Sequence, residues 1–266
     1  MKLYYAPGAC SFAPHVCLRE AGLPFTLVRM DRKTQTLDNG KRIEDINEKG
    51  YVPVLELDNG KRLTEAPAVL QYIADQSPAA GLAPAQGTWE RYKLQEWLNF
   101  LSSEVHKSFW PFFHDGCEEE KPAQAERLRG RFGWIERQLG DNPFIMSQRF
   151  TVADAYLLTM VNWLRPAGFD PGQWPRLKEY RARLISRPSV QAALEAEGLK
   201  KRPSSAATAT LLTIPWAGVA RYKATGDASG LGETAKKFQE RYRDSSWAKK
   251  ASVWRPPAKM AAPAAR

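Results

Sequence analysis

The apolar and polar positions of the first 77 residues predict strands and helices in alternation. KLYY (2–5) and FTLVRM (25–30) are short apolar runs typical of strands. Residues 11–21, between them, have the spacing of apolar residues expected for a helix, and Gly22 follows as a common helix-ending residue. The chain therefore begins with a predicted strand, helix and strand.

The next part of the pattern predicts a β-hairpin followed by a helix. VPVLEL (52–57) and KRLTE (61–65) are separated by Asp-Asn-Gly, residues that tolerate the positive φ angles of a tight turn. Residues 66–76 then place Val69 and Ile73 on one face of a helix. Strand–helix–strand followed by strand–strand–helix implies a small mixed sheet.

A linker rich in Pro, Ala and Gly (78–87) separates this region from a part whose pattern is helical throughout. We therefore expect an α/β domain at 1–77 and an all-helical domain at 88–200, so the fold class is α/β plus all-α. The predicted helices of the second domain cover residues 88–109, 123–140, 151–164, 174–188 and 189–198.

The net charge of +10 belongs to one end of the chain. Residues 200–266 hold 14 lysines and arginines against four acidic residues, whereas residues 1–199 hold 25 of each. We interpret 201–266 as a basic extension that is disordered or weakly docked. Its three tryptophans leave other roles open, namely docking on the body of the protein, binding of nucleic acid or another anionic surface, and no function.

The sequence offers no membrane span and no metal motif. Its longest uncharged run, 203–220, contains two prolines, and the start MKLYY lacks the apolar region of a secretory signal. Cys10, Cys17 and Cys117 are spaced neither as a disulfide framework nor as zinc ligands. We expect a cytoplasmic protein without a metal.

Cys10 directly precedes the first predicted helix. Free backbone N–H groups and the helix dipole at that position favour a thiolate, and a pKa lowered by about two units would leave most of the thiol ionised. A small buried apolar residue is the alternative. Because residue 13 is alanine, no two-cysteine redox motif is present, and any disulfide chemistry would be monothiol. Cys17 is expected in the helix core.

Five motifs, taken together, carry a resemblance to a known family. In their order and spacing, they make residues 1–200 resemble the bacterial beta-class glutathione transferases. The resemblance implies a thioredoxin-like domain joined to an all-helical domain, assembled as a homodimer, and the chain from about residue 201 lies outside it. The motifs are YYAPGACSFAPHVCLREAGLPF, GYVPVLEL, LTEAPAVLQYIAD, EWLNFLSSEVHKSF and TVADAYLLT.

The resemblance implies a glutathione site at two turns of the first domain. A cis bond before Pro53 would turn the backbone of Val52 toward the cysteine of glutathione, whereas an ordinary trans proline at a strand start is the alternative. Glu65 and Ala66, at the start of a helix, would hold the γ-glutamyl group. The alternative role for Glu65 is to cap the helix dipole.

The resemblance also implies residues of the long helix and of one loop. His106 would be catalytic together with Cys10, and Lys107 would add positive charge, although a solvated helix face is the alternative. Gln35 stands where family members commonly carry lysine, and Lys33 is a candidate to replace that charge. The other implied glutathione-binding residues are Tyr51, Asn99, Ser103 and Glu104.

Thr151 and Asp154 have the spacing of a helix capping box, and we assign them to structure, with a contribution of about 1 kcal/mol. Trp163 fits either the apolar wall of the site or the core.

We therefore expect a glutathione transferase that stabilises the glutathione thiolate for attack on a hydrophobic electrophile. Glutathione is the expected co-substrate. One alternative is a monothiol oxidoreductase or peroxidase that depends on Cys10, and another is a non-catalytic ligand-binding protein.

Overall fold

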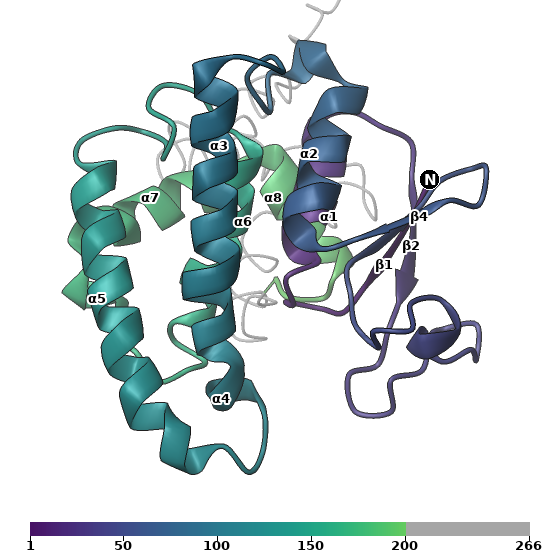
Figure 1. Ribbon diagram of the computed structural model, residues 1–266, viewed down its shortest axis with the longest axis horizontal. Helices are drawn as coiled ribbons and strands as arrows, with labels where there is room; N and C mark the ends of the chain where they lie inside the picture. Colours follow the sequence, from purple (N-terminus) through teal and green to yellow (C-terminus); the bar gives the residue numbers. More distant parts are fainter. Residues whose placement is uncertain (201–266) are drawn as a thin grey trace, which may run out of the picture. The chain divides into compact units, whose positions relative to one another are not determined.

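The computed structural model describes residues 1–200, so the predictions for 201–266 lie outside the described residues. A four-stranded mixed sheet with two helices comes first, and helices make up the rest of residues 1–200 (Figure 1). The expected fold class is confirmed. The elements are β1 (Lys2–Tyr5), α1 (Phe12–Glu20), β2 (Thr26–Arg29), β3 (Val54–Glu56), β4 (Arg62–Thr64), α2 (Ala66–Gln76), α3 (Trp89–Phe100), α4 (Trp110–Phe113), α5 (Lys121–Leu139), α6 (Val152–Trp163), α7 (Pro175–Ile185) and α8 (Pro188–Ala196).

The sheet has the strand order β2-β1-β3-β4. β1 pairs parallel with β2 and antiparallel with β3, and β3 pairs antiparallel with β4, with Val54 opposite Thr64. Gly60 has a φ of +79° in the turn between β3 and β4, a conformation that glycine adopts without strain. The predicted hairpin is confirmed.

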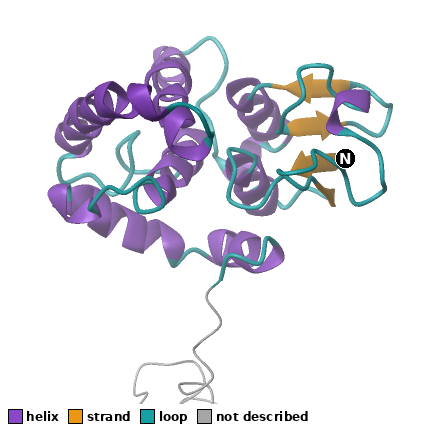
Figure 2. Ribbon diagram, turned by 90° about the horizontal axis from the view of Figure 1, so that it is seen from below, coloured by secondary structure: helices purple, strands orange, loops and turns teal. Residues whose placement is uncertain are grey.

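The two faces of the sheet are covered differently. α1 and α2 lie on one face, between the sheet and the other helices (Figure 2). The connection from β2 to β3 covers the opposite face, where Met30, Leu37 and Ile43 pack on Tyr4 and Val54. Both faces are therefore buried, and the loops at the strand ends are left to carry a site.

α6 is the most deeply buried helix of the second domain, with every residue of 152–161 buried. Thr151 and Asp154 form the predicted capping box at its start, where Asp154 Oδ2 accepts hydrogen bonds from the N–H (2.7 Å) and the hydroxyl (2.9 Å) of Thr151. α6 packs against α1, which links the helical domain to the sheet domain.

The predicted helix at 88–109 is not uniform. α3 ends at Phe100, and the chain continues as a π-helix over Leu101–His106 and a 3₁₀ turn over Lys107–Phe109 before α4. Wider π turns inside helices are frequent at functional sites. Among the helices of residues 1–200, none combines the length and the apolar character that a membrane span requires.

Candidate active site

Cys10 lies in the turn between β1 and α1. The turn is closed by backbone hydrogen bonds from Ala9 to Ala6 and from Phe12 to Ala9, which bring the start of α1 close behind the strand. The Cys10 thiol is half-buried and donates a hydrogen bond to the carbonyl oxygen of Val52, at 3.3 Å. Cys10 is thus placed beside the cis-proline loop, as the resemblance implies.

The pKa of Cys10 shifts in the direction opposite to the one we expected. Burial raises it to about 12, because a thiolate there would lose its hydration. The N–H groups of Cys10 and Ser11 lower the pKa, as the helix-start argument requires, and so does the positive charge of Arg32. These effects are smaller than the effect of burial, so the thiol is protonated at neutral pH.

The peptide bond between Val52 and Pro53 is cis, so that prediction is confirmed. The carbonyl oxygen of Val52 accepts a hydrogen bond from the Cys10 thiol, and it keeps a second lone pair with which a ligand can bond. Tyr51 is 42% exposed, and its own carbonyl accepts a hydrogen bond from the amide of Asn47. These two hydrogen bonds hold the two residues that precede Pro53.

Glu65 stands at the corner between β4 and α2, with a φ of +65°. Its Oε1 accepts hydrogen bonds from Lys49 Nζ, at 2.8 Å, and from the Tyr51 hydroxyl, at 2.7 Å. Both bonds lower the pKa of Glu65, so the carboxylate is charged at neutral pH. Glu65 is the N-cap residue of α2 and its side chain makes no capping hydrogen bond within residues 1–200, so both the ligand role and the interaction with the helix dipole stay open.

His106 ends the π-helical segment, and Lys107 begins the 3₁₀ turn that follows it. Nδ1 of His106 is 2.8 Å from the hydroxyl of Tyr156, and the imidazole packs on the indole of Trp163, with ring centroids 5.0 Å apart. Burial and the neighbouring charge of Lys107 lower the pKa of His106 to about 4, so the imidazole is neutral near pH 7. The solvated-face alternative is wrong for His106, which is half-buried, whereas Lys107 is exposed.

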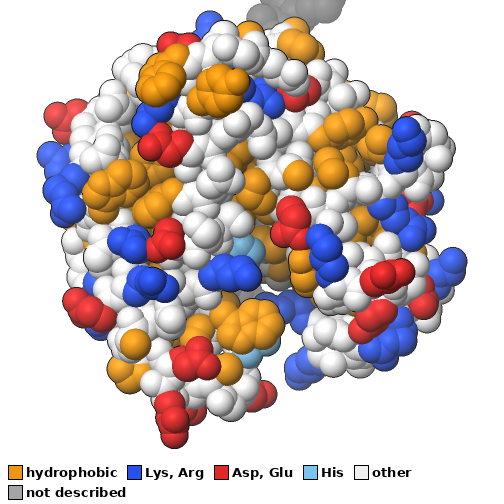
Figure 3. Space-filling view, in the orientation of Figure 1, with side chains coloured by type: hydrophobic (Ala, Val, Ile, Leu, Met, Phe, Trp, Pro, Cys, Tyr) orange, Lys and Arg blue, Asp and Glu red, His pale blue; other side chains and the backbone are white. Residues whose placement is uncertain are grey.

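The four groups Cys10, Glu65, His106 and Lys107 are close enough to influence one another. The charge of Glu65 acts on the pKa values of Cys10 and His106, and the charge of Lys107 acts on those of His106 and Glu65. The structure thus brings together residues from both domains. Figure 3 shows a hollow in this face of the molecule, with histidine atoms on its wall and charges of both signs around it.

Three of the implied glutathione ligands lie elsewhere on the long helix. The Glu104 carboxylate accepts a hydrogen bond of 2.6 Å from Arg131 on α5, and its role as a glutathione ligand stays a prediction. Asn99 and Ser103 are exposed, and the Ser103 hydroxyl donates to the carbonyl of Asn99 at 2.9 Å.

The role of Gln35 as a glutathione ligand, with Lys33 in place of the lysine of family members, stays a prediction, and the same loop brings Arg32 to the site. Gln35 has a φ of +56°, and its backbone bonds to Asp31 and Ile43. No contact within residues 1–200 ties the Gln35 or Lys33 side chain to Cys10. The positive charge that acts on Cys10 comes from Arg32, which the sequence analysis missed.

Trp163 borders the site. Its Nε1 donates a hydrogen bond of 2.7 Å to the carbonyl of Gly8, in the turn that carries Cys10. The indole also contacts the rings of Phe109 and Phe113 edge-on. Trp163 thus contacts the site through Gly8 and His106 and the core through Phe109, so both alternatives for it stay open. Tyr156 was missed as well, although a tyrosine hydroxyl in an apolar run indicates a buried polar partner.

No cluster of three potential metal-ligating His, Cys, Asp or Glu side chains occurs in the described part of the chain.

Comparison with known proteins identifies the family. Residues 8–76 match the glutathione S-transferase N-terminal domain, and residues 118–183 match the C-terminal domain. The chain is 43% identical to glutathione S-transferase GstA of Escherichia coli O157:H7, over 75% of this chain and all of the relative.

Two solved structures cover the same share of the chain. The glutathione S-transferase of a sphingomonad, complexed with glutathione, is 44% identical with a TM-score of 0.72, over 75% of this chain and all of that one. The beta-class enzyme of Sphingomonas chungbukensis is 46% identical with a TM-score of 0.73, over the same shares. The resemblance to the bacterial beta class is confirmed, and this chain belongs to the glutathione S-transferase family.

Proposed function

We propose that this protein is a glutathione transferase that joins the sulfur of glutathione to an electrophilic carbon of an apolar substrate. The observation that carries the proposal is the cluster of Cys10, Glu65, His106 and Lys107, drawn from both domains. Its charges match glutathione, which has an ammonium group at one end, carboxylates at both ends and a thiol between them.

Glutathione would bind with its γ-glutamyl end at Glu65 and Ala66. Lys49 and Tyr51 both bond to Oε1 of Glu65, and no residue of 1–200 bonds to Oε2, so that oxygen can take the ligand's ammonium group. The cysteine backbone of glutathione would pair with Val52. Its sulfur would then lie between Cys10 and His106.

The reaction needs a glutathione thiolate and an apolar place for the electrophile. The thiol proton leaves to water, the thiolate attacks carbon, a C–S bond forms, and the leaving group departs with its electron pair. Cys10, with a pKa of about 12, keeps its proton, and its S–H group, which donates to the Val52 carbonyl in this structure, would turn to donate to the thiolate instead. Trp163 and Phe113 offer the apolar wall.

Conjugation is tested by replacing Glu65 with glutamine. Because the ligand's ammonium group loses a charged partner, we expect the KM for glutathione to rise about tenfold with an aryl halide as the electrophile. Glu126→Gln, which changes an exposed carboxylate on α5, is the control and should leave KM unchanged. Equal kinetics in both variants would refute the pose, and a wild-type protein without conjugating activity would refute the function.

The raised pKa of Cys10 supports conjugation over the monothiol redox alternative. The wild-type protein is incubated with oxidised glutathione and its intact mass is measured, followed by peptide mapping. We expect no adduct at Cys10 near pH 7. A single glutathione adduct confined to Cys10, with Cys17 and Cys117 unmodified, would instead favour the redox function.

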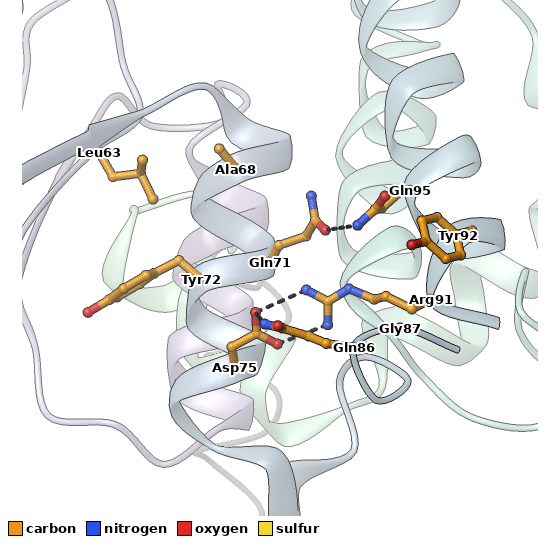
Figure 4. Close-up of a pocket in the computed structure, with 10 residues that line it drawn as sticks. All are labelled: Leu63, Ala68, Gln71, Tyr72, Asp75, Gln86, Gly87, Arg91, Tyr92 and Gln95. Atoms are coloured by element: carbon orange, nitrogen blue, oxygen red, sulfur yellow. Dashed lines mark hydrogen bonds and ion pairs between the residues drawn. The ribbon is translucent and has the colours of Figure 1, made fainter. Parts of the chain in front are cut away.

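We also propose a homodimer in the cytoplasm. Trp89 and Tyr92, on α3, are 72% and 57% exposed beside a pocket of about 530 Å³ between α2 and α3. In Figure 4, Gln71 and Gln95 bond across this pocket, so the two helices present one continuous face. Tyr92→Glu should shift the sedimentation coefficient to that of a monomer. The three cysteines, all free thiols, fit a reducing compartment.

A further inference from the structure

Tyr156 is a buried tyrosine that no established role of the site uses. It lies on α6, is 1% exposed, and places its hydroxyl 2.8 Å from Nδ1 of His106. Nε2, the other imidazole nitrogen of His106, has no hydrogen-bond partner within residues 1–200. The state of Nδ1 therefore decides what Nε2 can offer to a ligand.

The surroundings of Tyr156 fix the direction of this hydrogen bond. Burial raises the pKa of Tyr156, so the hydroxyl keeps its proton and must donate it to an acceptor. Within residues 1–200, the hydroxyl of Tyr156 meets one hydrogen-bonding atom at a normal distance, Nδ1 of His106 at 2.8 Å, so the tyrosine proton lies on that bond.

We propose that Tyr156 is a positioning residue: by donating to Nδ1, it holds the proton of the neutral His106 on Nε2, from where it is donated to the glutathione sulfur. This inference rests on the proposed function. An imidazole in this tautomer cannot accept the thiol proton at Nε2. It stabilises the thiolate as a hydrogen-bond donor, and the proton goes to water.

Other charges near His106 must be separated from the effect of the tautomer. The charges that act on the pKa of His106 are those of Lys107, the next residue in the chain, and of Glu65, at the corner between β4 and α2. Neither of them bonds to the hydroxyl of Tyr156. Replacing Tyr156 by phenylalanine therefore leaves their charges in place and removes the donor to Nδ1.

The tautomer can be measured directly by long-range ¹H–¹⁵N NMR of the histidine rings at pH 7. The chain has three histidines, and His15 is an internal control. Arg19 donates to Nε2 of His15 at 2.8 Å, so the His15 proton is on Nδ1, 2.8 Å from Glu197. We expect the Nε2–H tautomer for His106 and a mixture in Tyr156→Phe, with His15 unchanged. Nδ1–H for wild-type His106 would overturn the proposal.

The consequence for the ligand is measured by titrating the thiol of bound glutathione through its absorbance near 240 nm. We expect Tyr156→Phe to lower the thiolate fraction about fivefold at a pH below the midpoint, as for the loss of one hydrogen bond. Tyr180→Phe is the matched control, because it removes a buried hydroxyl that bonds to Asp154 at 2.9 Å. Its titration should match the wild type even if its stability falls.

The two proposals fail differently. An unchanged thiol midpoint in Tyr156→Phe, with glutathione bound and conjugated, would refute the role of Tyr156 and leave the transferase function intact. A wild-type protein that binds no glutathione would refute the proposed function, and the histidine spectra would still decide the tautomer.

Discussion

Asp154→Ala removes the acceptor at the start of α6. In the structure, Oδ1 of this buried carboxylate accepts the N–H of Ile145 at 2.8 Å and the hydroxyl of Tyr180 at 2.9 Å. Oδ2 accepts the N–H and the hydroxyl of Thr151. Four bonds at about 1 kcal/mol each suggest a loss near 4 kcal/mol, well above the 1 kcal/mol of an exposed cap. Burial raises the pKa of Asp154, and this cost of burying the carboxylate offsets part of the gain from its hydrogen bonds. We therefore expect Asp154→Ala to lower the free energy of unfolding by about 3 kcal/mol.

The assay is urea unfolding, with glutathione affinity measured at a temperature where the variant is folded. Asp170→Ala is the matched control, because Asp170 is an exposed aspartate that accepts the N–H of Gly172 at 2.9 Å. It should lose less than about 1 kcal/mol. Weakened glutathione binding at an unchanged melting temperature in Asp154→Ala, or equal losses in the two variants, would refute the reasoning.

Four further changes have expected outcomes. Glu56, with a pKa lowered to about 2 chiefly by its hydrogen bond from Lys2, stabilises the fold above pH 4.5, and that contribution is lost between pH 4.5 and 2. In Glu56→Gln, the free energy of unfolding should therefore depend less on pH in this range. Glu136→Ala uncaps α7, whose first N–H groups bond to it at 2.8 and 2.9 Å, and should cost about 2 kcal/mol in urea. Asp75→Ala leaves the buried guanidinium of Arg91 with the Pro84 carbonyl but without a charged partner, and should cost about 3 kcal/mol by the same method. Cys10 should react slowly with iodoacetamide at pH 7, and the rate of its alkylation, followed by peptide mapping, should rise with pH up to about 12.

Most of the fold could be predicted because its local signals agree with its packing. The hairpin between β3 and β4 has the turn residues that its geometry requires, and α6 starts at the capping box that its sequence contains. The long helix at 88–109 could not be predicted in detail. Its residues are all compatible with an α-helix, and the π turn at 101–106 adds a residue per turn that hydrophobic spacing does not reveal.

The site was only partly predictable for the same reason. Cys10 and Glu65 lie at turns whose position follows from the chain order, and the structure brings them together with His106. The Glu104 carboxylate bonds to Arg131, which lies on another helix and could not be identified as its partner from the sequence. The pKa of Cys10 is raised by burial and lowered by the N–H groups at the helix start. Which effect is larger depends on how deeply the folded chain buries the thiol, and the sequence does not show this.

α6 carries none of the catalytic residues implied by the resemblance, but it orients both sides of the site. Trp163 bonds to Gly8 in the turn of Cys10, and Tyr156 bonds to His106. These two side chains are seven residues apart, which is two turns on one face of a helix. α6 is buried throughout 152–161, and these two hydrogen bonds tie it both to the turn of Cys10 and to His106. The capping carboxylate of Asp154 therefore supports the geometry of the site through the helix it begins, and its effect on function should follow its effect on stability.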